Sequence, residues 1–414
     1  MMSITKTLDT IFARFSGITK SDRDFLTELF ELLLCIRGRV NFTNLARYSH
    51  YNEVTFRRHF KKFFDWFKFN YLLIELALLD TNAPVIAAMD CSYISKSGKH
   101  TSGLDRFWSG VANRIKKGLE ITLVCLINVQ TGQAWSLSVR QTPGGLSAKE
   151  GSQQDYTRTD FYIEQLADCI VQLPNIQYYT GDGFYAKTKV IEVVRQHGKH
   201  LISKLRCNAD LKYLLDRNKN PHAHGNRKYD GKVFWKTLDL NRWIYVGTDH
   251  KYPHLELYTQ ILYSPKFKCE IKVVFVKNTK TNKYVLLFTT DITLAARLIV
   301  TYYQLRFKIE FIFRDAKQFT GLTHCQARDE DKLDFHFNMS VAALNLYQYE
   351  ATVAQSNEST FSMNSIIRKA YNTKFLKLFF SKLSTEPNFD EILIQKDIKH
   401  PKIQEIIHWG RMNT

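Results

Sequence analysis

The order of strand-like and helix-like segments after residue 83 constrains the fold of this chain most strongly. Apolar, β-branched runs at 85–94, 119–132 and 134–143 predict three strands, and a Thr-Gly pair between the last two predicts a hairpin. Helix and strand patterns then alternate, in the order helix 157–173, strand 175–186, helix 187–198 and strand 200–206. This β-β-β-α-β-α-β order predicts an α/β domain, with a mixed sheet between helices on both faces.

The N-terminal residues 1–82 have the spacing of helices, and 41–67 predicts two helices joined by a short turn. The second helix would carry basic side chains around an aromatic face. These basic residues are Arg57, Arg58, Lys61 and Lys62. The pattern is typical of a recognition helix in a DNA major groove and equally of an ordinary amphipathic helix with a basic exterior, so both interpretations stay open.

Residues 207–283 interrupt the α/β pattern with alternating apolar runs that predict a β-rich insertion. Between residues 205 and 283 there are 16 Lys and Arg but only 7 Asp and Glu, so about half of the chain's net charge of +18 lies there. A solvated sheet edge guarded by lysines is one explanation. The concentration of charge favours the other, a surface that faces DNA.

The composition of the chain indicates the class of its binding partner and the cellular compartment in which it works. A net charge of +18 indicates a polyanion, and nucleic acid is the first candidate. No run of 18 apolar residues occurs, and the N-terminus lacks a signal-peptide core, so we expect no membrane attachment. The seven cysteines are scattered without a CxxC pair, which predicts reduced thiols in the cytoplasm.

After the insertion, a strand pattern at 283–292 leads into a predicted helix that begins near residue 293 and contains no Gly or Pro. At about 100° per residue, four of its side chains fall on one stripe. They are Tyr303, Arg306, Glu310 and Lys317. A carboxylate among two cations and a phenol suits binding of a metal ion and phosphates. An exposed ion pair between Arg306 and Glu310 is the simpler alternative.

The stripe has the spacing Y-x2-R-x3-E-x6-K, and it resembles the signature of the insertion-sequence-four family of DDE transposases. The resemblance covers residues 85–322 and implies a ribonuclease-H-like fold, in which the strands at 85–94 and 175–186 are neighbours. It implies a catalytic core at 83–206 and 284–325. The predicted β-rich insertion lies within that core, and a helical region at 326–414 follows it.

The same resemblance implies that Asp90, Asp182 and Glu310 are the catalytic carboxylates and hold two Mg²⁺ ions, which Mn²⁺ could replace. Asp90 follows an apolar run, where an unpaired carboxylate is costly. Asp182 lies between two glycines that allow a tight turn. Taken alone, a capping or turn role explains each aspartate equally well.

Family members also bind the DNA end that they cleave. The resemblance implies phosphate contacts for Tyr303, Arg306 and Lys317. A tryptophan that stacks on a flipped base in some members is replaced here by Tyr284, with Trp235 and Trp243 as alternatives in the insertion.

The expected function is cut-and-paste DNA transposition. We expect the protein to bind double-stranded DNA at terminal inverted repeats and at the target, to act as a homodimer, and to be associated with the nucleoid in the cytoplasm. Three alternatives remain: a nuclease that cleaves without strand transfer, an inactive relative that acts as a DNA-binding repressor, and a basic protein that coats nucleic acid.

Overall fold

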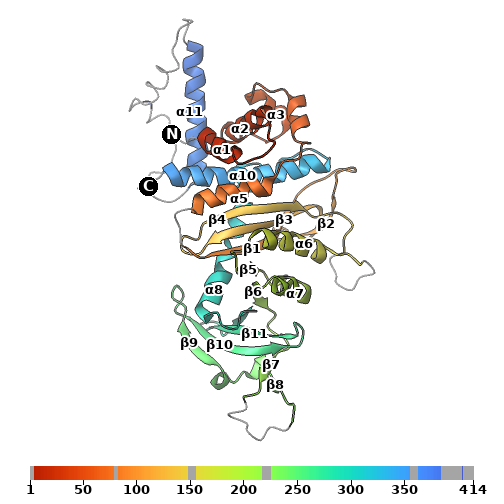
Figure 1. Cartoon of the computed structure of the whole chain (residues 1–414), viewed down its shortest axis with the longest axis vertical. Coiled ribbons are helices and arrows are strands. Elements are labelled where there is room, and N and C mark those ends of the chain that lie inside the picture. Colours follow the sequence, from red (N-terminus) through yellow and green to blue (C-terminus); the bar gives the residue numbers. More distant parts are fainter. Residues whose placement is uncertain are drawn as a thin grey trace. The chain divides into compact units, whose positions relative to one another are not determined.

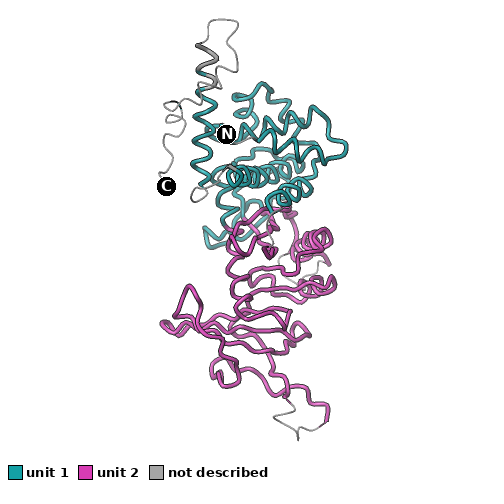
Figure 2. The backbone as a smooth tube through the Cα atoms, turned by 60° about the vertical axis from the view of Figure 1, so that its left-hand side comes forward, with its two compact units in different colours: residues 1–81, 93–119, 311–414 teal, residues 82–92, 120–310 magenta. Residues whose placement is uncertain are grey.

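The computed structural model describes residues 4–78, 83–147, 155–216, 225–354, 362–383 and 403. They form two compact units (Figure 2). The helical unit comprises residues 1–81, 93–119 and 311–414, and the sheet unit comprises 82–92 and 120–310. The end of the predicted C-terminal helical region, 384–414 apart from residue 403, lies outside the described residues.

The helical unit contains seven helices among its described residues, besides most of α9, which is described below. They are α1 (Ile4–Phe12), α2 (Lys20–Cys35), α3 (Phe42–Tyr48), α4 (Glu53–His59), α5 (Trp66–Leu78), α10 (Glu330–Ala354) and α11 (Met363–Leu383). The long helix α10 lies along α5 (Figure 1). Asn345 of α10 donates to Oδ1 of Asn70 over 2.9 Å in the buried interface, and the rings of Phe30 and Phe69 stack at 5.4 Å. The core of this unit is therefore largely aromatic, and its buried amide pair is hydrogen-bonded.

Helices α3 and α4 agree with the two predicted at 41–67, but the second is shorter than expected. Asn41 and Asn52 cap them by accepting from the backbone N–H groups of Asn44 and Thr55. Helix α4 ends at His59, because the N–H groups of residues 61 and 62 bond to carbonyls only three residues back. Phe63 lies beyond this end and is 92% exposed, so it does not extend the aromatic face of the second predicted helix.

The strands of the described residues form one 12-stranded mixed sheet. Its order is β2-β3-β1-β5-β6-β12-β11-β10-β7-β8, with β4 paired to β3 and β9 paired to β10. The bounds are β1 (Val85–Ile94), β2 (Asp105–Ser109), β3 (Arg114–Asn128), β4 (Ala134–Gln141), β5 (Tyr178–Gly181), β6 (His200–Leu205), β7 (Lys212–Leu214), β8 (Tyr229–Lys232), β9 (Ile244–Thr248), β10 (Leu255–Ser264), β11 (Cys269–Asn278) and β12 (Tyr284–Thr289). Strands β1, β5 and β6 pair in parallel, and the antiparallel neighbours make the sheet mixed.

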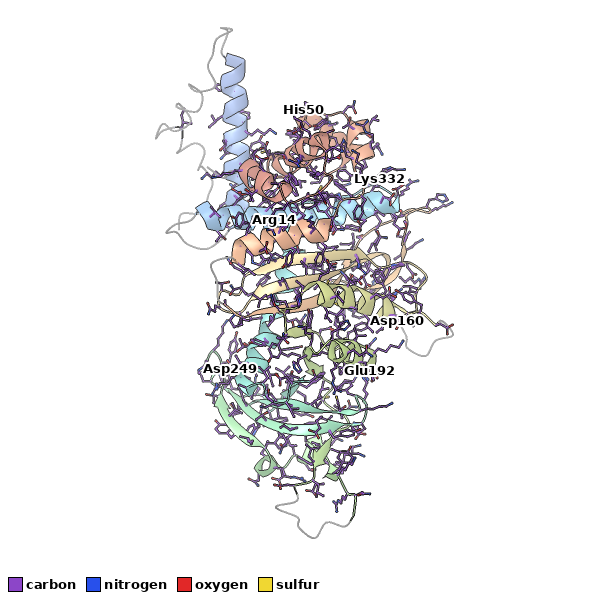
Figure 3. All side chains as sticks on the ribbon, viewed as in Figure 1. Arg14, His50, Asp160, Glu192, Asp249 and Lys332 are labelled. Carbon is purple, nitrogen blue, oxygen red and sulfur yellow. The ribbon has the colours of Figure 1, made fainter. Side chains whose placement is uncertain are left out.

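Helices flank this sheet. Helix α6 (Arg158–Gln172) contacts β4, α7 (Thr188–Gln196) contacts β6, and α8 (Ala296–Leu305) contacts β5, β6, β11 and β12. Asp160, labelled in Figure 3, accepts from the backbone N–H of Thr157 over 2.9 Å and from Lys189 Nζ over 2.7 Å, which fixes the start of α6 against α7. The element order and the parallel pairing of β1 with β5 confirm the predicted ribonuclease-H-like α/β fold.

The segment 207–283 is β-rich, as expected, but its strands do not form a separate sheet. Strand β11 pairs with β12 along six residues, and β12 pairs in turn with β6 of the core. The inserted strands therefore continue the central sheet outward. Strand β2 lies between the first two predicted strands, in a segment for which the sequence pattern predicted no strand.

The helix predicted from near residue 293 through Lys317 is two helices, so that prediction is wrong. Helix α8 ends at Leu305, and α9 begins at Lys308 and ends at Phe319. The N–H groups of residues 307, 309 and 310 donate to carbonyls three residues back instead of four, which tightens the chain and starts a new helix. The first turn of α9 belongs to the sheet unit and the remainder to the helical unit.

Candidate active site

The strand register brings two carboxylates together. In the parallel ladder between β1 and β5, Ala88 lies opposite Thr180 and Met89 opposite Gly181. The residue that follows Met89 on β1 is Asp90, and the residue that follows Gly181 at the end of β5 is Asp182. Adjacent strands lie about 4.8 Å apart, so these two residues are neighbours across the ladder.

Asp90 is half-buried, with a side chain that is 22% exposed. Its Oδ1 accepts from the N–H of Cys91 over 2.8 Å, and its Oδ2 accepts from Arg306 Nη1 over 3.0 Å. Burial raises the pKa of Asp90 to about 6; Arg306 opposes that rise, while Asp182 and Glu310 add to it. Asp182 and Glu310 thus both lie within electrostatic reach of Asp90.

Asp182 is held by the turn that follows β5. Its Oδ1 accepts from the N–H of Phe184 over 2.9 Å, and its carbonyl accepts from the hydroxyl of Ser203 over 2.7 Å. A Cβ on Gly181 would lie 2.8 Å from the ring of Tyr185, so only glycine fits there beside that ring. The turn is therefore fixed by its neighbours as well as by its own hydrogen bonds.

Tyr185 and Cys91 are site residues that sequence patterning did not single out. The Tyr185 hydroxyl lies 3.2 Å from Cys91 Sγ, and the ring packs against Gly181. Cys91 directly follows Asp90, and Gly181 directly precedes Asp182. The buried Tyr185 side chain therefore contacts a direct sequence neighbour of each aspartate. The only sequence signal near Tyr185 was the Gly-Asp-Gly turn, which ends two residues before it.

Arg306 connects Asp90 to Glu310. Its side chain is 12% exposed, and its Nη2 lies 3.4 Å from Oε1 of Glu310, which is 44% exposed. Its guanidinium carbon lies 5.8 Å from the centre of the Tyr303 ring. Burial lowers the pKa of Arg306, but Asp90, Tyr303 and the other carboxylates raise it more, so the net shift is upward. The ion pair with Glu310, the simpler alternative for the stripe, does form, together with a stronger contact to Asp90.

Lys317, the fourth residue of the predicted stripe, belongs to the helical unit. Its Nζ donates to the carbonyl of Tyr93 in the same unit over 3.2 Å. Burial lowers the pKa of Lys317. Tyr303, Arg306 and Glu310 lie in the sheet unit.

Tyr284, the residue in the place of the stacking tryptophan, begins β12. Its hydroxyl donates to the carbonyl of Cys207 over 2.9 Å, and its ring stacks on Phe275 with centres 5.0 Å apart. Trp235 lies 6.4 Å from the same ring. Trp243 is only 5% exposed, so the alternative that it stacks on a base is wrong for this conformation.

The basic residues around α4 are mostly paired with acids of the helical unit. Lys62 lies 2.6 Å from Asp22, Lys61 lies 3.5 Å from Asp329, and Arg57 pairs with Glu53. Arg58 forms no ion pair with a described residue. A DNA phosphate would have to displace three acids here, which favours the amphipathic interpretation of this helix in the free protein.

The oxygen atoms of Asp90, Asp182 and Glu310 are chemically suitable ligands for a hard metal ion, but the three side chains are not close enough to bind one together. Asp and Glu oxygens are the ligands that Mg²⁺ prefers. Within the described ranges, however, no three His, Cys, Asp or Glu side chains are close enough together to hold a metal ion. The Arg306 guanidinium contacts two of the three carboxylates instead.

The fold and the neighbouring aspartates, Asp90 within β1 and Asp182 directly after β5, define a nuclease core of the ribonuclease-H-like class. Residues 13–241 match the family described as DDE superfamily endonuclease, and the chain belongs to this family of nucleic-acid-cleaving enzymes. Residues 150–346 match the family described as transposase DDE domain. The coarser prediction, a DDE-type transposase or endonuclease domain, is confirmed.

Individual relatives are distant. No curated protein matches the chain. One similar solved structure is endonuclease V from Ciona intestinalis in complex with a 23mer DNA containing an inosine followed by a ribo-adenosine, at 11% identity and a TM-score of 0.23, over 64% of this chain and 91% of that one. Among the helices that the structure describes, none has the length and apolar character needed to cross a bilayer.

Proposed function

We propose that this chain is a DNA transposase of the insertion-sequence-four kind. It would bind the terminal inverted repeats of its own element, cleave DNA strands there, and join the freed 3′-hydroxyls to target DNA. The observation that carries the proposal is the pairing of Met89 with Gly181, which makes Asp90 and Asp182 neighbours, while Arg306 reaches from Asp90 to Glu310.

In this proposal, Asp90, Asp182 and Glu310 are the ligands of two Mg²⁺ ions, with Mn²⁺ as a substitute. When bound, such a metal pair activates the attacking oxygen and stabilises the leaving oxygen of a phosphodiester. The oxygen donors fit this chemistry. All three carboxylates can serve together only after Glu310 approaches the aspartates and the Arg306 guanidinium moves from between them.

A DNA phosphate supplies a reason for Arg306 to move. Its guanidinium is a fork of donors that fits a phosphate as well as a carboxylate. Tyr303 lies beside it, and burial raises the pKa of this phenol, which keeps its proton for donation to an anion. We assign Tyr303, Arg306 and Lys317 to phosphates near the cleaved end and Tyr284 to an unstacked base.

The distribution of charge supports DNA as the partner. The insertion carries the excess of 16 basic over 7 acidic residues between 205 and 283, and its strands continue the sheet that bears the aspartates. Synapsis of two element ends requires at least two copies of the chain, so a homodimer is part of the proposal. The reaction would take place on the chromosome, in the cytoplasm and at the nucleoid.

Two assays test this function. Element ends that are already cleaved, mixed with target DNA and Mg²⁺, are expected to yield joined products. Cleavage of intact ends without joining would refute the transposase proposal in favour of a nuclease that lacks strand transfer.

The second assay addresses a repressor role. Asp182→Asn removes one carboxylate charge and keeps the size of the side chain. It is expected to abolish cleavage and to leave end binding within about twofold, since phosphate contacts provide most affinity for DNA. Equal loss of binding and cleavage would contradict the role given to Asp182, and end binding without cleavage by the unsubstituted chain would indicate a repressor.

A further inference from the structure

A β-hairpin of the helical unit exposes apolar side chains among cations. Strand β2 pairs with the first residues of β3, with Arg106 opposite Lys117 and Trp108 opposite Ile115. We name residues 105–118 the 105–118 hairpin. Its register alternates the two faces, so Trp108 and Ile115 share one face as a cross-strand pair.

The two faces of the hairpin differ sharply in burial. Phe107 is 0% exposed and Ser109 is 4% exposed, which anchors one face in the helical unit. On the other face Trp108 is 56% exposed and Ile115 is 63% exposed, and Val111 at the turn is fully exposed. Exposed apolar residues are ordinary when single, but a cross-strand pair that exposes a tryptophan, with a further exposed valine at the turn, indicates a surface that binds a partner.

The charges around this cluster identify the chemistry of its partner. The 105–118 hairpin contains one acid, Asp105, and four cations, which are Arg106, Arg114, Lys116 and Lys117. Arg114, Lys116 and Lys117 form no ion pair with any residue that the structure describes. A polyanion would supply the counter-charges for these three cations.

We propose that the 105–118 hairpin is a DNA-contacting wedge. Trp108 and Ile115 would press against an opened base step of duplex DNA, and the flanking cations would hold the phosphates on both sides. Aromatic rings stack on unpaired bases, and apolar wedges are inserted where a duplex is kinked. The choice of DNA over another polyanion rests on the proposed function.

Binding to distorted DNA tests the wedge without any cleavage step. The full chain carrying Asp182→Asn is titrated with two fluorescent duplexes of equal length, one fully paired and one with a mismatch beside 2-aminopurine. The parent is expected to bind the mismatched duplex roughly tenfold more tightly and to raise 2-aminopurine fluorescence as the base unstacks. Trp108→Ala is expected to lose both the preference and the fluorescence rise while still binding the paired duplex.

Matched variants separate the wedge from general effects. Val171 on α6 is 66% exposed, so Val171→Ala removes a comparable exposed apolar side chain and is expected to change neither signal. Trp108→Phe keeps an aromatic ring and is expected to keep most of the preference. The double variant Lys116→Gln with Lys117→Gln is expected to reduce the slope of log affinity against log salt by about 2, one phosphate contact for each lysine.

The outcomes discriminate between explanations. An unchanged mismatch preference in Trp108→Ala overturns the proposal. The proposal is also overturned if Trp108→Ala changes the oligomeric state, measured by sedimentation, but leaves DNA binding unchanged. The exposed surface would then join two copies of the chain. Failure of the unsubstituted chain to cleave or join DNA would refute the proposed function, whereas these binding measurements would still decide the wedge.

Discussion

The guanidinium of Arg306 donates to Oδ2 of Asp90 over 3.0 Å, although the two residues are separated by 216 positions in the sequence. The same cation reaches Glu310, so it neutralises carboxylates that come from a strand and from a separate helix. A buried cation in this position stabilises the free protein and has to give way when a phosphate or a metal ion takes over the carboxylates.

Arg306→Ala is expected to destabilise the protein by roughly 2 kcal/mol, because Asp90 loses its charged hydrogen-bond partner while staying largely buried. The free energy of unfolding in urea at neutral pH measures the effect. Arg306→Lys keeps the charge without the fork and is expected to lose less. An Arg306→Ala protein as stable as the parent would show that the contact contributes nothing.

The pKa of Asp90 predicts a dependence of stability on pH. Because its folded-state pKa is raised from 3.8 to about 6, the folded protein binds this proton more tightly than the unfolded chain does. The resulting stabilisation is fully present below pH 3.8 and is lost as the pH rises through about 6, by about 3 kcal/mol. Asp90→Asn does not titrate, so the difference in unfolding free energy between the two proteins should follow this curve. A pH-independent difference would contradict it.

Binding of Mg²⁺ should show the same proton competition. Calorimetric titration of the protein in complex with a DNA duplex is expected to give tighter Mg²⁺ binding above pH 6 than below it, because a protonated Asp90 is no ligand. Asp182→Asn is expected to weaken binding at every pH. Binding that is unchanged in Asp182→Asn would place the metal elsewhere in the protein.

Gly181 and Gly183, on either side of Asp182, provide a test substitution and its matched control. A Cβ on Gly181 would lie 2.8 Å from the Tyr185 ring, whereas one on Gly183 would lie an ordinary 3.4 Å from the carbonyl of Lys204. Gly181→Ala is expected to cost roughly 1–3 kcal/mol of stability and to displace Tyr185, and with it the support of both aspartates. Gly183→Ala should cost much less. Equal thermal melting temperatures for the two variants would argue against a positioning role for Tyr185.

His336 predicts acid sensitivity in the helical unit. Its Nε2 lies 2.8 Å from the carbonyl of Gly321, and burial lowers its pKa to about 4. A lowered pKa contributes stability that is present above the unfolded value of 6.5 and is lost as the pH falls through about 4, by about 3 kcal/mol. His336→Gln does not titrate and should flatten unfolding free energy over this range. An unchanged slope would assign acid sensitivity to other groups.

The sequence allowed the core of the site to be predicted because its signals are local. The apolar run before Asp90 marks a buried strand and the glycines around Asp182 mark the end of another, and the strand order then makes the two aspartates neighbours. The break between α8 and α9 had no such signal, since no Gly or Pro lies there. It coincides with Arg306, whose side chain is engaged by Asp90 on a strand far away in the sequence, a tertiary contact that no window of residues records.

Strand β2 was missed for a related reason. Its outward residues, Arg106 and Trp108, stay in solvent, and only Phe107 and Ser109 turn inward. Five residues with so short an apolar pattern do not distinguish a strand from a polar loop. The pairing with β3 defines this strand, so it became visible only in three dimensions.

The continuity of β6, β12 and β11 has a consequence for how this enzyme can be altered. An accessory module attached by two linkers can be trimmed or exchanged, because its removal leaves the remaining sheet edges as they were. Here the chain returns from the insertion through β12, which is bonded to β6 on one side and β11 on the other. Deleting the insertion would strip β12 of its outer neighbour and expose a long apolar edge. Shortened versions of this protein should therefore aggregate, and natural relatives with other insertions would need a different strand to close the sheet.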